Sequence, residues 1–171
     1  GYCYPDTYYF SAGEDPREIV RFLNRQLHEN IARAGLEDTL RRSPWTFHEV
    51  LTLASIVEGE ARLPEERPVI AQVFEKRLGM EMPLESCATV LFALGKHRDK
   101  LYFEDLEIDS PYNTYKIYGL PPGPINNPGL ASITAVLHPA STDYLYFVSK
   151  NDGSHYFSKT YAEHLEAKRL Y

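Results

Sequence analysis

One helix in the middle of the sequence most limits how this chain can fold. Thr46 and Glu49 have the spacing of a capping box, so we expect a helix that begins after Thr46 and runs to about residue 62. At about 100° per residue, its apolar side chains fall on one stripe, which predicts that the helix packs against a core. The residues of this stripe are Phe47, Val50, Leu51, Ala54 and Ala61. Glu58 lies near the middle of the stripe, where an apolar residue is expected.

A carboxylate at position 58 needs a physical explanation. Burying an ionised carboxylate is costly, so such a group is normally paired, protonated or functional. Desolvation raises the pKa of a carboxylic acid, and an acid that keeps its proton near neutral pH can act as a general acid. We therefore predict a raised pKa for Glu58 and a role in catalysis. The structural alternative is an ion pair, with Arg67 or Arg77 as the partner.

Length and charge limit the class of protein. The 171 residues suffice for one domain with a real core. The formal net charge is −6 and the sequence contains no basic stripe, which argues against a nucleic-acid partner. No run approaches eighteen apolar residues. The chain opens in the middle of an extended pattern, so we expect it to be part of a longer protein.

The remaining patterns predict an α+β fold with helices around a small antiparallel sheet or hairpin. We expect a strand and turn over residues 1–12, and a polar linker before Pro44. The turn Asn151-Asp152-Gly153 between two alternating runs predicts a hairpin. Helices are expected over residues 15–34, 64–79, 89–95, 129–138 and 161–171. No domain boundary is visible, so residues 1–171 form a single expected domain.

Residues 109–129 form the region with the highest density of helix breakers. Five of the twelve prolines and three of the ten glycines fall in this stretch, which forbids regular structure over most of it. A rigid, irregular segment within a compact domain is a good wall for a cleft. The alternative is a structural connection without chemistry.

Most familiar catalytic motifs are absent. The sequence has no G-x-S-x-G elbow, P-loop or dinucleotide fingerprint, and its histidines show no metal-binding pair. Cys3 and Cys87 lack metal-type spacing, and the sequence leaves open whether they pair. Carboxylate acids are the usual catalysts of glycoside cleavage, normally in pairs. The candidates for a second carboxylate are Glu60, Glu66, Glu85 and Asp109, and the sequence singles out none of them.

Six blocks in order carry a resemblance to one family. They read LTLASIVEGEA, ERPVIAQVFEKRL, GMEMPLESCATVLFALG, SPYNTYKIYGLPPGPINNPG, ITAVLHPASTDYLYFV and GSHYFSKTYAEH, and the opening YPDTYYF fits as well. Together they resemble the YceG-like endolytic murein transglycosylases over nearly the whole chain. The resemblance implies a bacterial enzyme that cuts peptidoglycan glycan strands between N-acetylmuramic acid and N-acetylglucosamine, without a metal or cofactor.

The resemblance also implies a cellular setting. Members of the family carry an N-terminal membrane helix and a LysM-like portion, so this chain is expected to be the catalytic region alone. That region would work outside the cytoplasmic membrane, in the periplasm or at the cell-wall face. Cell-wall synthases are expected as partners, with the exposed face of residues 15–34 as one contact surface.

Site residues follow from matching blocks. The family's catalytic glutamate lies in the block IVEGEA and carries over to Glu58. The block SPYNTY implies sugar contacts for Tyr112, Asn113 and Tyr115. Glu85 stands where the family commonly has glutamine, and we expect it to bind substrate and to raise the pKa of Glu58 further if the two side chains meet.

The implied mechanism needs a single carboxyl group. Protonated Glu58 donates to the glycosidic oxygen and then, as a carboxylate, takes the proton of the sugar's 6-hydroxyl, which closes a 1,6-anhydro ring. Two other functions remain open at this point. One is a muramidase-type hydrolase that uses Glu85 or Asp109 as a second carboxylate. The other is a non-catalytic module that binds peptidoglycan through its tyrosines.

Overall fold

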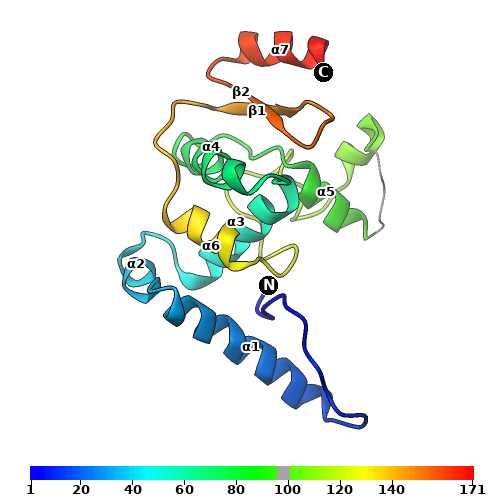
Figure 1. Cartoon of the computed structure of the whole chain (residues 1–171). Helices are drawn as coiled ribbons and strands as arrows, with labels where there is room; N and C mark the ends of the chain where they lie inside the picture. The colour runs from blue at the N-terminus through cyan, green and yellow to red at the C-terminus, as the bar shows by residue number, and fades with distance from the viewer. Residues whose placement is uncertain (96–100) are drawn as a thin grey trace.

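The predicted α+β class is confirmed. The computed structural model describes residues 1–95 and 101–171, which contain seven α-helices and one two-stranded antiparallel hairpin (Figure 1). Two short 3-10 helices, η1 and η2, complete the regular elements. Within the described residues, no helix is both long and apolar enough to cross a membrane.

Helix α3, Phe47–Glu60, lies at the centre of the molecule (Figure 1). The predicted capping box is confirmed: the Thr46 side chain accepts a hydrogen bond from the backbone of Glu49, whose carboxylate accepts one from the backbone of Thr46. The predicted stripe is too narrow, because every residue from Val50 to Val57 is buried. A helix that is buried on all sides is surrounded by other elements, so α3 is the core of the fold rather than one wall of it.

Three helices pack around α3. Helix α6, Leu130–Leu137, lies against both α3 and α4, Arg67–Gly79, and α5, Cys87–Leu94, packs near the end of α3. The helix predicted from Pro64 begins as the 3-10 turn η1, Pro64–Glu66, and becomes α-helical only at Arg67. Gly95 ends α5 in the left-handed conformation that glycine adopts without strain.

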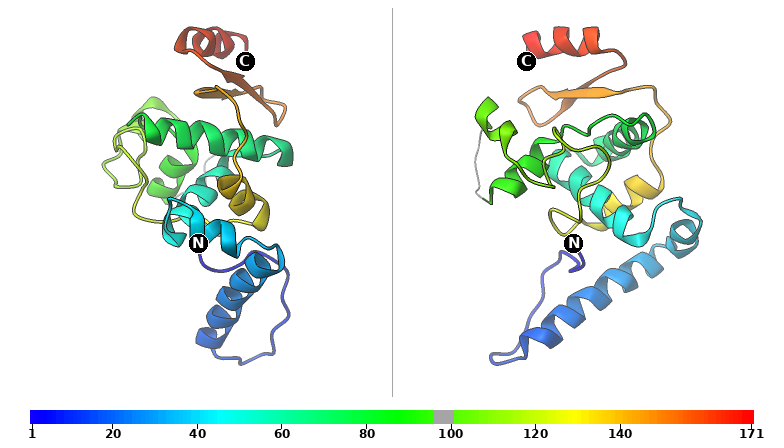
Figure 2. Two further views of the ribbon diagram at one scale, coloured as in Figure 1. Left: turned by 90° about the vertical axis from the view of Figure 1, so that its left-hand side faces the viewer. Right: turned by 180° about the vertical axis from the view of Figure 1, so that it is seen from behind.

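Helix α1, Pro16–Arg33, extends away from this core (Figures 1 and 2). The Asp15 side chain caps it at the expected start, only Leu27 and Ile31 of its apolar side chains are buried, and Val20 is exposed. The strand predicted within residues 1–12 is absent; this segment runs irregularly along α1, held by a bond from the Tyr4 amide to the Leu23 carbonyl. The predicted polar linker contains one further helix, α2, Glu37–Arg42.

The hairpin packs between α4 and the C-terminal helix (Figure 1). Strands β1, Tyr146–Ser149, and β2, His155–Ser158, pair as predicted, with Ser149 opposite His155. Phe147 reaches the ring of Phe74 on α4, with centroids 5.7 Å apart. Helix α7, Tyr161–Leu170, covers the other face of the hairpin.

The proline-rich segment is irregular, as predicted, and is tied to α3 by buried polar groups. The Ser55 hydroxyl accepts a bond from the Ile125 amide at 2.9 Å, and the Ser55 carbonyl accepts one from the Asn126 side chain at 2.8 Å. The segment follows the second 3-10 helix, η2, Phe103–Glu107, which the sequence patterns did not predict. These bonds place the segment beside the last turns of α3, where Glu58 lies.

Candidate active site

Glu58 lies at the meeting point of α3, α4 and α6. One carboxylate oxygen, Oε2, accepts hydrogen bonds from the Ser132 hydroxyl at 2.7 Å and the Gly129 amide at 3.1 Å. The other, Oε1, pairs with the Arg67 guanidinium at 3.3 Å. Arg67 in turn donates to the Ser132 hydroxyl at 3.1 Å. The ion pair with Arg67 was one of the two pairings expected from the sequence.

This environment overturns the predicted pKa shift of Glu58. Partial burial by itself would raise the pKa, but the bonds from Ser132 and Gly129 and the charge of Arg67 outweigh it, so the pKa lies below its ordinary value. Gly129 also precedes the first turn of α6, where the helix dipole favours an anion. The side chain is 30% exposed, so it is also less buried than its place on the predicted apolar stripe implied. Without substrate, these bonds and the ion pair favour the ionised form of Glu58.

Glu60, two residues further on, has a different environment. Its Oε1 accepts hydrogen bonds from the Ser86 hydroxyl and, at 3.2 Å, from the Ala88 amide. These groups lie at the N-terminal end of α5, so Glu60 caps α5 much as Glu58 caps α6. Among the described residues, Oε2 of Glu60 accepts no hydrogen bond and is not one of the buried polar atoms that lack a partner. That oxygen is therefore accessible from outside.

Glu60 borders a groove formed by two adjoining hollows. The larger, of about 460 Å³, lies between α4, α5, β1 and α7, and the smaller, of about 160 Å³, lies beside the hairpin turn. Glu60, Ser149 and His155 line both hollows, so we treat them as one groove. Glu58 lines neither hollow. A half-open hollow with polar walls and apolar patches is the kind of site that takes an extended polar ligand.

Glu85 lines the larger hollow but does not act on Glu58. Its carboxylate pairs with the Arg77 guanidinium at 2.9 Å, and it is not among the groups that shift the pKa of Glu58. The backbone of Glu85 has a φ of 53°, which is unusual for a residue with a side chain. Its amide donates to the Thr114 carbonyl, so the segment that contains Tyr112 and Asn113 holds Glu85 at the groove.

The three residues of the SPYNTY block have different places. Tyr115 lines the groove, and burial raises the pKa of its hydroxyl, which keeps the proton and lies 3.3 Å from the Cys87 sulfur. Tyr112 lines neither hollow and packs on Phe92, with ring centroids 4.7 Å apart.

Asn113 is placed where a sugar contact is hard to make. Its side chain is fully buried at 0% exposure; its amide group donates to the carbonyls of Leu106 and Ile108 and accepts from the Tyr115 amide. These three bonds shape the loop that carries Tyr115. The expected direct contact does not fit this burial, and the geometry gives Asn113 a structural place instead.

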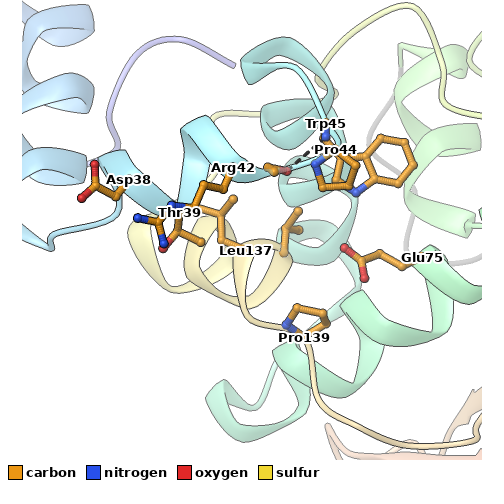
Figure 3. A pocket seen from close by; sticks show the side chains of 10 residues that line it. Asp38, Thr39, Arg42, Pro44, Trp45, Glu75, Leu137 and Pro139 are labelled. Atoms are coloured by element: carbon orange, nitrogen blue, oxygen red, sulfur yellow. Dashed lines mark hydrogen bonds between the residues drawn. The ribbon is translucent and has the colours of Figure 1, made fainter.

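A third cavity lies away from both carboxylates. It measures about 560 Å³ and is the largest of the three hollows described here (Figure 3). Trp45 and Glu75 lie on one side of it and Asp38 on the other, with Leu137 and Pro139 between them (Figure 3). Burial raises the pKa of Glu75. Since neither Glu58 nor Glu60 reaches this cavity, its size alone does not make it the site of carboxylate chemistry.

Cys3 and Cys87, whose pairing the sequence left open, are both free thiols. Within residues 1–95 and 101–171 the structure contains no group of three metal-binding side chains close enough to hold an ion.

Two features of the groove were missed by the sequence patterns. Glu60 was one of four possible second carboxylates, and nothing separated it from the other three. His155 and Glu66 form a close pair across 89 positions of the chain, at 2.6 Å, which no local pattern could reveal. The one available signal was the VEGE spacing at residues 57–60, which sets two carboxylates about 200° apart, on nearly opposite faces of one helix end.

Comparison with known proteins places this geometry in a family. A model of the YceG-like family matches residues 1–170. A protein of Bacillus subtilis (strain 168) named endolytic murein transglycosylase is 45% identical over 172 residues, covering 100% of this chain and 47% of the relative. A protein of the same name from Streptococcus pneumoniae serotype 2 is 34% identical over 170 residues, covering 96% of this chain and 30% of the relative.

A solved structure agrees with the sequence comparisons. The crystal structure of a yceG-like protein from Listeria monocytogenes superposes with a TM-score of 0.91 at 44% identity, covering 98% of this chain and 54% of that one. The chain thus spans less than half the length of the curated relatives described above.

Proposed function

The chain belongs to the YceG-like family, and on that premise we propose that it is the catalytic part of an endolytic murein transglycosylase. The substrate is the glycan strand of peptidoglycan, and the bond cut joins N-acetylmuramic acid to N-acetylglucosamine. The product carries a 1,6-anhydro ring on the N-acetylmuramic acid. The observation that best supports this function is a helix-capping carboxylate, Glu60, with one free oxygen at a groove of suitable size.

The reaction needs one carboxyl group that acts twice. In its acid form the group donates a proton to the glycosidic oxygen while the bond to the anomeric carbon breaks. The resulting carboxylate accepts the proton of the sugar's 6-hydroxyl as that oxygen attacks the anomeric carbon. The proton is returned to the carboxyl group, so the cycle consumes neither water nor a cofactor.

Two carboxyl groups near the end of α3, Glu58 and Glu60, compete for this role. The family resemblance assigns it to Glu58. The geometry favours Glu60, because Glu60 borders the groove whereas Glu58 lines neither hollow and is held as an anion by Ser132, Gly129 and Arg67. A residue that must hold a proton for donation is poorly served by a guanidinium partner. We therefore propose Glu60 as the acid and base, with Glu58 as the competing assignment.

The walls of the groove supply contacts for the sugar. Tyr115 offers a protonated hydroxyl and a flat apolar ring, and Glu85 offers a carboxylate for sugar hydroxyls. We propose both as substrate-binding residues. Tyr112 lines neither hollow and would act only through its packing on Phe92.

We further propose that this part of the protein works outside the cytoplasm, where its substrate lies, and beside the synthases that extend glycan strands. The part of α1 that projects from the core, with Val20 exposed, is the surface we propose for that contact. Loss of co-purification with a synthase on Val20→Asp, with cleavage retained, would support this surface, and unchanged co-purification would remove it.

Digestion of purified peptidoglycan, followed by mass spectrometry of the products, tests the reaction. The wild-type chain should release anhydro ends, which are one water lighter than reducing ends. Reducing ends would indicate a two-carboxylate hydrolase, for which Glu60 and Glu85 line the same groove. Binding without products would indicate a module that only binds glycan.

Two matched variants test the assignment of the acid. Glu60→Gln should lower the rate by about 100-fold or more, the scale of a lost general acid. Glu58→Gln should keep most of its activity at temperatures where it stays folded. Glu65→Gln, an exposed glutamate with no contact to the groove, is the control and should be unaffected. The reverse pattern, with Glu58→Gln inactive and Glu60→Gln active, would return the role to Glu58.

A further inference from the structure

His155 and Glu66 form a close pair at the edge of the groove. Glu66, in η1, accepts two hydrogen bonds from His155: one from its backbone amide at 2.9 Å and one from Nδ1 of its ring at 2.6 Å. Both side chains are nearly buried, with 8% of His155 and 11% of Glu66 exposed. A carboxylate that takes both the backbone and the ring of one histidine fixes where that ring points.

The rest of the surroundings fix the ring from its other sides. The His155 ring meets Phe147 edge to face, with centroids 5.3 Å apart, and lies 6.2 Å from the ring of Phe157. Both phenylalanines belong to the hairpin, so the ring is held by its own sheet as well as by Glu66. The ring has little freedom to turn away from this orientation.

The pair with Glu66 also decides which ring nitrogen is free. An ionised carboxylate can only accept hydrogen bonds, so Nδ1 carries the proton and Nε2 presents a lone pair in the neutral ring. Among the described residues Nε2 has no hydrogen-bond partner, and it is not one of the buried polar atoms that lack one. Nε2 is therefore accessible, and His155 lines both hollows that Glu60 borders.

We propose that His155 is a substrate-binding residue of the groove, whose Nε2 accepts a hydrogen bond from a hydroxyl or amide N–H of the glycan, and that Glu66 is the positioning residue that aims it. The inference rests on the proposed function, because it names a contact to the same glycan. It adds an imidazole nitrogen to a groove whose other polar walls include the carboxylates of Glu60 and Glu85.

The competing explanation is a purely structural pair that fastens the hairpin to η1. The two roles use different ring nitrogens, so they can be separated by substitution. Asparagine at position 155 places an amide nitrogen near the position of Nδ1 and keeps the bond to Glu66, but it removes Nε2. Glutamine reaches the position of Nε2 and gives up the bond at Nδ1.

The experiment measures kcat/KM on purified glycan strands and the thermal midpoint for both variants. His155→Asn should keep a midpoint close to that of the wild type and lose about five- to tenfold in kcat/KM, the effect of one hydrogen bond to the substrate. His155→Gln should melt several degrees lower and, at a temperature where it is folded, cleave faster than His155→Asn. His28→Asn, on exposed α1, is the matched control and should change neither quantity.

A wild-type value of kcat/KM in His155→Asn would overturn the proposal. So would a decrease of kcat/KM in both variants that is fully explained by the decrease in the fraction of folded protein. A measurement without substitution covers the case in which the variants do not fold. Long-range ¹H–¹⁵N spectra of the wild-type chain should show a protonated Nδ1 and a bare Nε2, with the Nε2 signal shifting when chitotetraose is added. An unmoved Nε2 signal at saturating chitotetraose would also overturn it.

Failure of the proposed function has a separate signature. If the wild-type chain released no anhydro ends, the reaction would be wrong, while the Nε2 shift with chitotetraose would still report on the contact. If anhydro ends form and His155→Asn equals the wild type, only the role of His155 falls.

Discussion

Two carboxylates near the end of α3 differ sharply although only one residue separates them. Glu58 reaches the start of α6 and uses both of its oxygens: Oε2 for Ser132 and Gly129, Oε1 for Arg67. Glu60 reaches the start of α5 and uses one oxygen, Oε1, for both of its contacts. Both oxygens of Glu58 have partners at the junction of three helices. Among the described residues only one oxygen of Glu60 has partners, and the other faces the groove.

The difference teaches that burial of a carboxylate does not by itself indicate catalysis. A burial pattern in sequence reveals that a charged group sits among apolar neighbours, but the sign of the pKa shift depends on what else meets it. At Glu58 an arginine and two donors favour the charged form over the acid.

The largest expected change in stability comes from Arg67→Met, which keeps the side-chain stem and removes the charge. Glu58 would lose its ion-pair partner, and the Ser132 hydroxyl would lose the hydrogen bond from Arg67. Only 14% of the Arg67 side chain is exposed, so solvent replaces these contacts poorly. We expect a loss of about 2–3 kcal/mol in the free energy of unfolding, less than the roughly 3–5 kcal/mol for a fully buried pair, because 30% of the Glu58 side chain is exposed. Urea titration at neutral pH measures it.

The control for this substitution is Arg62→Met, because Arg62 is exposed and contacts no carboxylate within the described chain. Its free energy of unfolding should stay within about 0.5 kcal/mol of the wild type. Equal losses in the two variants would mean that the Glu58 junction contributes nothing particular to stability.

A smaller effect separates the two glutamates themselves. Glutamine at position 60 can keep its carbonyl oxygen at Oε1 and satisfy both Ser86 and Ala88, so its stability should change by less than about 0.5 kcal/mol. At position 58 both oxygens accept hydrogen bonds, so the NH₂ group of a glutamine must face either Arg67 or the pair Ser132 and Gly129. The substitution should therefore lower the free energy of unfolding by about 1.5–2 kcal/mol. Thermal and urea unfolding of the two variants side by side measure the difference. Equal losses of stability in Glu58→Gln and Glu60→Gln would contradict the different environments of the two carboxylates.

The smallest effect is the pH dependence that the Glu58 pair contributes. Because its folded-state pKa is lowered, the stability it adds is fully present above its unfolded-state pKa of 4.5 and is lost as pH falls through the folded-state pKa. The stability gap between the wild type and Glu58→Gln should therefore be widest near pH 6–7 and should narrow below about pH 4.5. Unfolding both proteins in urea from pH 7 to pH 3 measures the gap, and a gap that widens in acid would show that the pKa is raised instead.

Much of the fold was predictable because its signals are local. Thr46 and Glu49 cap α3 within one turn, Asp15 does the same for α1, and Asn151 to Gly153 close the hairpin without help from the rest of the chain. The failures lie where the local signal was weak. Residues 1–12 have the composition of a strand but no partner strand beside them, so they run along α1 instead.

The site was predictable only as a neighbourhood. The sequence pattern led to the last turns of α3 and to the segment that carries Tyr115, and both lie near the groove. It could not rank Glu60 above Glu58, because Ser132 and Gly129 lie more than seventy positions away from Glu58 along the chain. It also could not place Asn113 in the interior. There the side chain donates hydrogen bonds to the carbonyls of Leu106, in η2, and Ile108, the residue after η2.

The amino-acid sequence indicated six of the seven described α-helices to within a few residues at their ends, the segment that is barred from regular structure, and the family that the chain resembles; it missed α2 and η2. The helices and the irregular segment depend on caps, prolines, glycines and periodicities that act over a few residues, and the resemblance depends on six sequence blocks in order. The tertiary structure alone decided which carboxylate is held as an anion, which one borders the groove, and that Glu66 aims His155. Charge state and access depend on groups brought together from distant positions, and only the packed chain brings them within hydrogen-bonding distance.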